Sequence, residues 1–193
     1  MNNKLKYSMI FGNSLCSYIY GFTGPIVTIY FSSHVNPNIF AIANMITLGL
    51  GALVNHSVGI DRFMNIYRKY FSYIIFMDLI CCAIVYTFSA EHVSFRYISM
   101  AIINAVTTSL WVIVINNAIN RNIGGDNLTK FNACMNSYEL WASMFGALTY
   151  ILLDNTNISI NHCLLIQWMA MLVMGMIDMR SFKKLNKVKV EED

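Results

Sequence analysis

Residues Pro37 to Ser57 read PNIFAIANMITLGLGALVNHS, a run without a single Lys, Arg, Asp or Glu. Such a run is long enough to cross the hydrocarbon core of a bilayer, which takes roughly 17 to 25 apolar residues in a helix. The rest of the chain is also apolar, since 56% of the 193 residues are hydrophobic and 12% are charged. We therefore expect a membrane protein rather than a soluble globular domain.

Five further apolar runs lie along the chain on both sides of this one. The six predicted spans cover residues 8–31, 37–57, 71–89, 97–119, 132–153 and 160–179. The predicted fold class is all-α, a polytopic bundle of six transmembrane helices that forms a single membrane domain over residues 1–193, with sequence neighbours antiparallel. The longest predicted loop runs from Asn120 to Lys130, and residues 180–193 form a polar tail that is either solvated or a helix on the membrane.

Basic residues are distributed very unevenly across this topology. All Lys and Arg residues except Arg96 fall in the N-terminal segment, in the loops after the second and fourth spans, or in the tail. Because short loops rich in Lys and Arg stay cytoplasmic, we predict that both termini are cytoplasmic, in a cell inner membrane. The lipid bilayer accounts for these basic residues, so the net charge of +3 does not indicate a nucleic-acid partner.

The first span carries polar residues and a proline. Asn13 and Tyr18 are candidates for lining a substrate cavity, and Gly24-Pro25 follows them. Proline removes a backbone donor, so we expect the helix to kink or unwind at this point. Broken helices at mid-depth are typical of transporter binding sites. Gly and Pro are also common in membrane helices where they only shape the packing.

The fourth span presents a polar face. Asn104, Thr108 and Trp111 are separated by four and three residues, so they share one side of the predicted helix. Such a stripe lines a cavity, in which Trp stacks on a ligand and Asn fixes its orientation. It equally serves to hold helices together by hydrogen bonds.

Two acidic residues, Asp78 and Glu139, lie well inside predicted spans. An ionised carboxylate at the centre of a membrane helix costs about 2.5 to 3.5 kcal/mol on insertion scales, and no span contains a Lys or Arg to pair with it. Both are therefore candidates for proton coupling, Glu139 more than Asp78. The alternative is a neutral carboxyl that hydrogen-bonds to neighbours such as Asn136 or Ser143.

The loop after the second span contains a recognisable motif. Asp61-Arg62 is followed by the basic pair Arg68-Lys69. The segment from Ser57 to Lys69 resembles the loop motif of the major facilitator superfamily, in which a Gly precedes an Asp-Arg pair by four residues and another Gly and two basic residues follow. The sequence departs from that motif at Ser57 and Met64, which replace the glycines, and in the later position of the basic pair.

Six spans with both termini cytoplasmic correspond to one half of a major facilitator, so the resemblance covers nearly the entire chain. It implies a membrane transporter, or half of one, that moves a small solute by alternating access. A lone half would turn cavity-facing polar groups toward lipid. We therefore expect a homodimer, or a pairing with a second membrane chain.

Two other functions fit the same topology. One is a non-transporting accessory or immunity protein that binds a partner in the membrane, and the other is the substrate-binding membrane subunit of an ATP-driven importer. An enzyme is not expected, because no nucleophile elbow and no paired-histidine metal motif is present. We predict no metal and no cofactor. The sequence does not identify the substrate, the direction of transport or the coupling ion.

Overall fold

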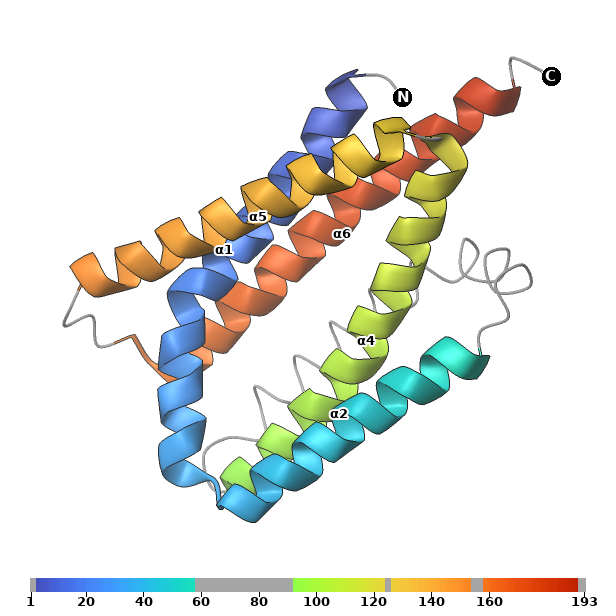
Figure 1. Cartoon of the computed structure of the whole chain (residues 1–193). Helices are drawn as coiled ribbons and strands as arrows, with labels where there is room; N and C mark the ends of the chain where they lie inside the picture. The colour runs from blue at the N-terminus through green and yellow to red at the C-terminus, as the bar shows by residue number, and fades with distance from the viewer. Residues whose placement is uncertain (1–2, 58–91, 124–125, 154–157, 191–193) are drawn as a thin grey trace. The chain divides into compact units, whose positions relative to one another are not determined.

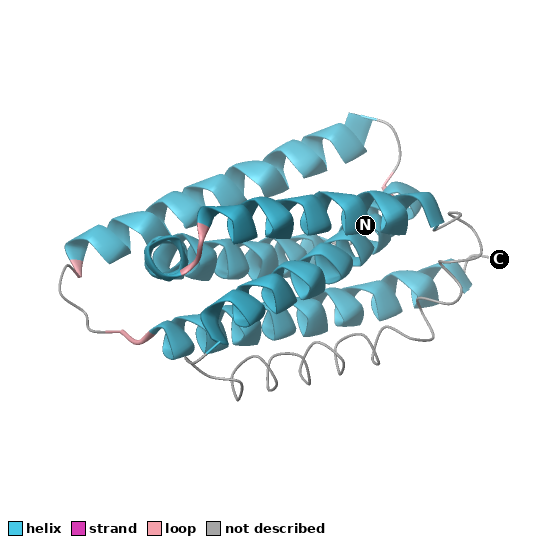
Figure 2. Ribbon diagram, turned by 90° about the horizontal axis from the view of Figure 1, so that it is seen from below, coloured by secondary structure: helices cyan, strands magenta, loops and turns pink. Residues whose placement is uncertain are grey.

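The computed structural model describes residues 3–57, 92–123, 126–153 and 158–190, and the regular structure in these ranges is helical (Figure 1, Figure 2). The helices are α1 (Asn3–His34), α2 (Pro37–Ser57), α4 (Val93–Asn122), α5 (Asp126–Leu152) and α6 (Ile160–Val190). The predicted all-α class is therefore confirmed. Within the described residues, Pro37–Val54 of α2 and Ile160–Asp178 of α6 are long and apolar enough to cross a membrane.

The observed helices agree with the predicted spans at α2 and extend beyond them elsewhere. The predicted loop from Asn120 to Lys130 is wrong in length, because α4 continues to Asn122 and α5 begins at Asp126. The tail is helical as far as Val190, as a direct continuation of α6. The predicted third span, residues 71–89, lies outside the described residues.

Two helix starts are fixed by local hydrogen bonds. Before α2, the side-chain oxygen of Asn36 accepts from the backbone N–H of Asn38 at 2.9 Å, and Pro37 occupies the first helical position. Before α6, the Ser159 hydroxyl lies 2.6 Å from Nδ1 of His162 and accepts from its backbone N–H. An Asn or Ser cap satisfies a donor that the first turn leaves free, and proline there loses no helical bond.

The described helices form two compact units. Unit 1 contains α1 up to Val27, α4 from Ala118, and all of α5 and α6. Unit 2, from Thr28 to Asn117, contains the end of α1, all of α2 and most of α4.

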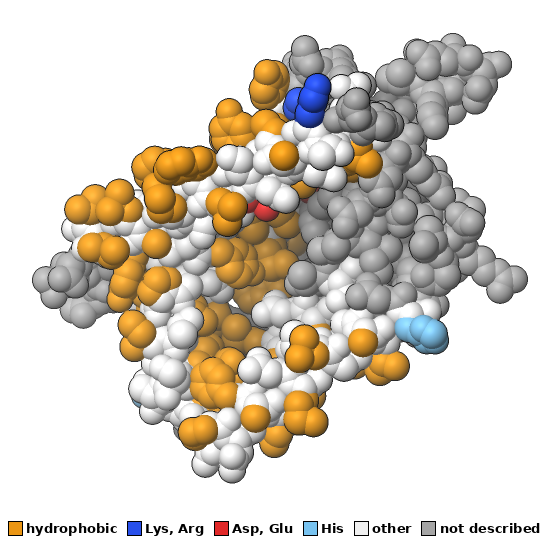
Figure 3. Space-filling model, viewed as in Figure 1, with side chains coloured by type: hydrophobic (Ala, Val, Ile, Leu, Met, Phe, Trp, Pro, Cys, Tyr) orange, Lys and Arg blue, Asp and Glu red, His pale blue; other side chains and the backbone are white. Residues whose placement is uncertain are grey.

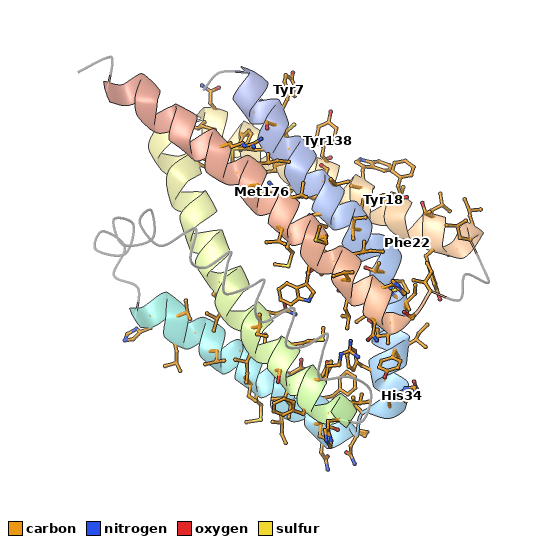
Figure 4. The ribbon with its side chains drawn as sticks, turned by 180° about the vertical axis from the view of Figure 1, so that it is seen from behind. Tyr7, Tyr18, Phe22, His34, Tyr138 and Met176 are labelled. Carbon is orange, nitrogen blue, oxygen red and sulfur yellow. The ribbon has the colours of Figure 1, made fainter. Side chains whose placement is uncertain are left out.

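In unit 1, α5 crosses α1 with their backbones in contact. A Cβ atom added to Gly146 would overlap the carbonyl oxygen of Tyr18 and lie 2.8 Å from the backbone nitrogen of Phe22. One added to Gly21 would lie 2.9 Å from backbone atoms of Ser143. Figure 4 shows Tyr18 and Phe22 on α1 at the level of this crossing. Small residues permit this approach, as is usual for helix pairs in membranes.

The predicted unwinding at Gly24-Pro25 does not occur, because α1 remains helical from Asn3 to His34 with Pro25 inside it. A kink at this point stays a prediction. Gly24 has no atom within 4 Å of where its Cβ would lie, so packing does not require a glycine there. The proline explains it, since a Cβ on the preceding residue is crowded by the proline ring in a helix. The hydroxyl of Thr23 bonds to the carbonyl oxygen of Ile19 at 2.7 Å in the same turn.

Unit 2 is held together by aromatic rings at the turn between α1 and α2. The ring of Tyr97 on α4 lies 5.0 Å from that of Phe31 and 4.5 Å from that of Phe40, measured between centroids. Arg96, which was predicted to lie in an outer loop, is in the first turn of α4 and only 2% exposed. Tyr30 lies near enough to act on it electrostatically.

We predict that Gly146→Ala destabilises the protein, because the new methyl group would push α5 away from the α1 backbone. Overpacking of this kind costs about 1 to 3 kcal/mol, which lowers the Tm of a chain of this size by about 2 to 12 °C. The measurement is thermal unfolding in detergent micelles. Gly49→Ala is the matched control, since its Cβ would meet nothing within 4 Å. Equal Tm values for the two variants would contradict the close crossing.

Candidate functional site

The polar interior of unit 1 follows the contact line between α1 and α6. We define the α1–α6 seam by four residue pairs, in order along α1: Gly12 with Ile177, Asn13 with Asp178, Tyr20 with Met171, and Thr23 with Gln167. Gly12 and Asn13 pair with residues 177 and 178, whereas Tyr20 and Thr23 pair with residues 171 and 167, so the two helices are antiparallel. Figure 1 shows them side by side in the same relation. Asn13, Tyr20 and Thr23 recur at seven and three residues, which keeps them on one helix face.

One end of the seam is a complete hydrogen-bond chain. Nε2 of Gln167 donates to the hydroxyl oxygen of Thr23 at 2.8 Å, and that hydroxyl donates to the carbonyl oxygen of Ile19. Thr23 is fully buried and Gln167 nearly so. These two hydrogen bonds therefore satisfy polar atoms that water cannot reach, as buried polar groups require.

The other end of the seam contains a buried carboxyl group. Asp178 is 0% exposed, and no described residue donates a hydrogen bond to either of its oxygens. The Asn13 amide lies beside it but donates to the carbonyl oxygen of Met9 at 2.9 Å. Glu139 of α5 is near enough for its charge to act on Asp178, and both acids act on the buried thiol of Cys16. Three helices thus bring two carboxyls and a thiol together.

Two of the predicted cavity residues lie in unit 1, where they turn to different helices. Asn13 lies in the seam, toward α6. The hydroxyl of Tyr18 lies 3.0 Å from that of Thr149 on α5. Each therefore contributes to helix packing, and the structure does not bring them together. Asn104 is a half-buried residue of unit 2, and the side chains of Thr108 and Trp111 are outside the described part. The cavity itself stays a prediction.

The predicted coupling residues have different outcomes. Glu139 is half-buried on α5, and no hydrogen bond joins it to Asn136 or Ser143 in the described ranges. Its part in proton coupling stays a prediction. Asp78 lies outside the described residues, as do the four charged residues of the loop motif: Asp61, Arg62, Arg68 and Lys69.

Asp178 was missed by the sequence analysis, which counted only Asp78 and Glu139 as acids within spans. It lies one residue before the end of the predicted span 160–179, close to exposed Arg180, and so resembles an ordinary helix-end acid. The sequence did contain a signal. Gln167, Met171 and Asp178 recur at four and seven residues, so they share one face of the helix.

The outer surface of unit 1 includes many exposed apolar side chains. Along α5 the exposed side chains include Leu140 and Trp141, 73% and 55% exposed, and Leu152, 75% exposed. Figure 3 shows hydrophobic side chains over much of α5, with Lys and Arg confined to one end. Contiguous apolar surface of this extent marks contact with lipid or with another protein.

Comparisons with known protein families, with curated proteins and with solved structures found no match for this chain. The resemblance to the major facilitator superfamily stays a prediction.

The bond between Thr23 and Gln167 leads to a prediction about stability. Thr23→Val leaves the buried amide of Gln167 without its acceptor, which we expect to cost about 1 to 3 kcal/mol. The double variant Thr23→Val/Gln167→Leu removes both partners and should recover most of that loss, because an apolar pair of similar shape leaves nothing unsatisfied. Thermal unfolding in micelles measures both effects. Thr28→Val on the exposed side of α1 is the control. A double variant that is less stable than the single one would contradict the assignment.

Proposed function

We propose that the chain is a multi-pass protein of a cell inner membrane, with six transmembrane helices and cytoplasmic termini, that moves a small solute by alternating access. The observation that carries this proposal is that unit 1 buries four polar side chains in a mainly apolar interior and exposes large apolar side chains on its surface. Buried Asn13, Thr23, Gln167 and Asp178 lie inside, while large apolar side chains of α5 are exposed. Such a distribution suits a hydrocarbon environment, in which polar groups are satisfied within the bundle.

The carboxyl groups favour transport over a purely structural role. Ionisable residues inside a membrane are expensive, and they commonly belong to ion or proton pathways. Glu139 and Asp178 come from different helices and interact electrostatically. A pair on two helices senses any movement of one helix against the other, which alternating access requires.

A second copy of the chain is the proposed partner. One half of a major facilitator encloses no central pathway, so a parallel dimer about an axis normal to the membrane would supply the other wall. The apolar surface of α5 and the exposed residues Leu48 and Met45 of α2 offer areas for lipid or subunit contact.

We predict that the purified protein is a dimer in lipid nanodiscs, as measured by native mass spectrometry. The expected mass is about twice that of one 22.0 kDa chain. The monomer mass across a range of protein concentrations would contradict the homodimer, and would direct the search to a second membrane chain isolated from native membranes.

We predict that Glu139→Gln abolishes proton-coupled transport and leaves expression unchanged. Glutamine has nearly the same shape as a neutral glutamate but cannot release a proton. The assay uses proteoliposomes with an imposed pH gradient, an internal pH-sensitive dye and a panel of small solutes. The control is Asn136→Gln, because the Asn136 side chain is exposed. Gln167→Glu would not serve as a control, because it would disturb the α1–α6 seam. If a solute drives the same proton movement in wild type and in Glu139→Gln, Glu139 is not part of the transport mechanism.

The exposed small residues of α2 favour one alternative, an accessory protein that binds a partner in the membrane. A Cβ on Gly49 would meet nothing within 4 Å, and Ala52 is exposed three residues later. Such a face accepts the close approach of another helix. Substitution Gly49→Leu should block partner binding if this alternative is correct, whereas transport should tolerate it.

A further inference from the structure

We infer that the buried carboxyl group of Asp178 is a proton-binding site, and that it shares its proton with Glu139 of α5. This inference deepens the proposed function and rests on it for its role in transport. Proton binding itself does not depend on transport.

Among the described residues, the Asn13 amide is the one group that favours the charged form of Asp178, and no positively charged side chain of that part acts on it. The side chain is 0% exposed, and its two oxygens accept no hydrogen bond from any described residue. A buried ionised carboxylate without a partner is strongly unfavourable, and such groups take up a proton instead. The nearby Asn13 amide is a dipole without net charge, and it is engaged with the carbonyl oxygen of Met9.

Within the described part of the chain, the titratable groups that act on Asp178 add no positive charge. From α5 the group is Glu139, and from α1 it is the thiol of Cys16. On α6 itself Arg180 follows two positions later, but its side chain is exposed. Two carboxylates close together repel each other when both are ionised, so a single proton stabilises the pair. Protons leave such a pair in steps that belong to both groups.

The two acids differ in their access to the outside. Asp178 is fully buried in the α1–α6 seam, whereas Glu139 is half-buried on α5. Among the described acids, Glu139 is therefore the one through which a proton can reach Asp178.

Infrared spectroscopy of the wild-type protein in lipid tests the proton-binding site, because the C=O stretching band of a neutral carboxyl is separate from the bands of carboxylates and amides. An ordinary aspartate, with a pKa of about 3.9, is protonated in about one molecule in a thousand at pH 7. We expect Asp178 to be protonated in at least half of the molecules, an increase of about 500-fold. The band should be present in wild type at pH 7, absent in Asp178→Asn, and lost as the pH rises further.

Glu139→Gln tests the sharing of the proton. With the second carboxyl removed, Asp178 has no ionised neighbour to repel, so its band should disappear at a lower pH than in wild type. If the band disappears at the same pH in Glu139→Gln and in wild type, the two carboxyls do not share a proton and Asp178 binds its proton alone. Identical spectra of wild type and Asp178→Asn at pH 7 would overturn the proton site altogether.

Two further measurements keep the test decisive. Asn replaces a neutral Asp with little change of shape, so the Tm of Asp178→Asn should change by less than about 4 °C. A larger fall would indicate an ionised aspartate with a positive partner and would contradict the proposal. If that variant does not fold, carbon-13 labelling of aspartate in the Asp78→Asn variant identifies the band. If the band is present at pH 7 but no solute drives proton movement in proteoliposomes, the proton site stands and the transporter is rejected. If a solute drives proton movement but the band is absent, transport stands and the proton site is rejected.

Discussion

Polar side chains that are closed off from water need partners inside the protein, and the α1–α6 seam is where unit 1 provides them. Gln167, Thr23 and the carbonyl oxygen of Ile19 form one satisfied chain. Because hydrogen bonds of this kind are directional, they fix the register between two antiparallel helices that apolar contacts alone would allow to slide. The position of every other seam residue, including Asp178, follows from that register.

The crossing of α1 and α5 adds a second constraint of a different kind. Gly146 brings the two backbones into contact beside Tyr18, and the hydroxyl of Tyr18 lies 3.0 Å from that of Thr149 one turn further along α5. α1 is therefore held by α6 through hydrogen bonds and by α5 through close packing. Glu139 lies on α5 and Asp178 on α6, the two helices that α1 contacts in unit 1, and α1 contributes Asn13 and Cys16 to their surroundings.

Hydropathy alone could predict most of the described fold. The run Pro37 to Ser57 predicted the bounds of α2, and α1, α4 and α6 contain their predicted spans and extend past them, whereas α5 begins six residues before its predicted span and ends one residue short of it. They extend because the membrane limits only the apolar part of a helix, and polar turns such as 180–190 continue it wherever backbone hydrogen bonds can form. The continuity of α1 at Pro25 could not be predicted, since Thr23 and Gln167 stabilise that turn from residues far apart in the sequence.

The candidate site was less predictable for the same reason. Glu139 was identified from its position in the middle of a span, but Asp178 was not, because an acid at the end of a span is ordinary until its neighbours are known. Asn13 and Tyr18 were predicted to line one cavity, and that cavity stays a prediction. Their five-residue separation, which turns them to different neighbours, was not considered, and that separation was visible in the sequence.

Unit 1 combines exposed leucines with a fully buried acid, an arrangement that water does not favour. Leu140 and Leu152 are about three-quarters exposed, whereas Asp178 is entirely buried. Burying a leucine side chain is worth about 1.5 to 3 kcal/mol, so a water-soluble fold would gain by exchanging these positions. In hydrocarbon the exposed leucines cost nothing, and the acid has to be inside. α5 therefore has one face that needs lipid or an apolar partner, and it also carries Glu139, which is half-buried and whose charge acts on Asp178. A movement of α5 would change the surroundings of both carboxyls at once, which is the property that a proton-coupled mechanism requires.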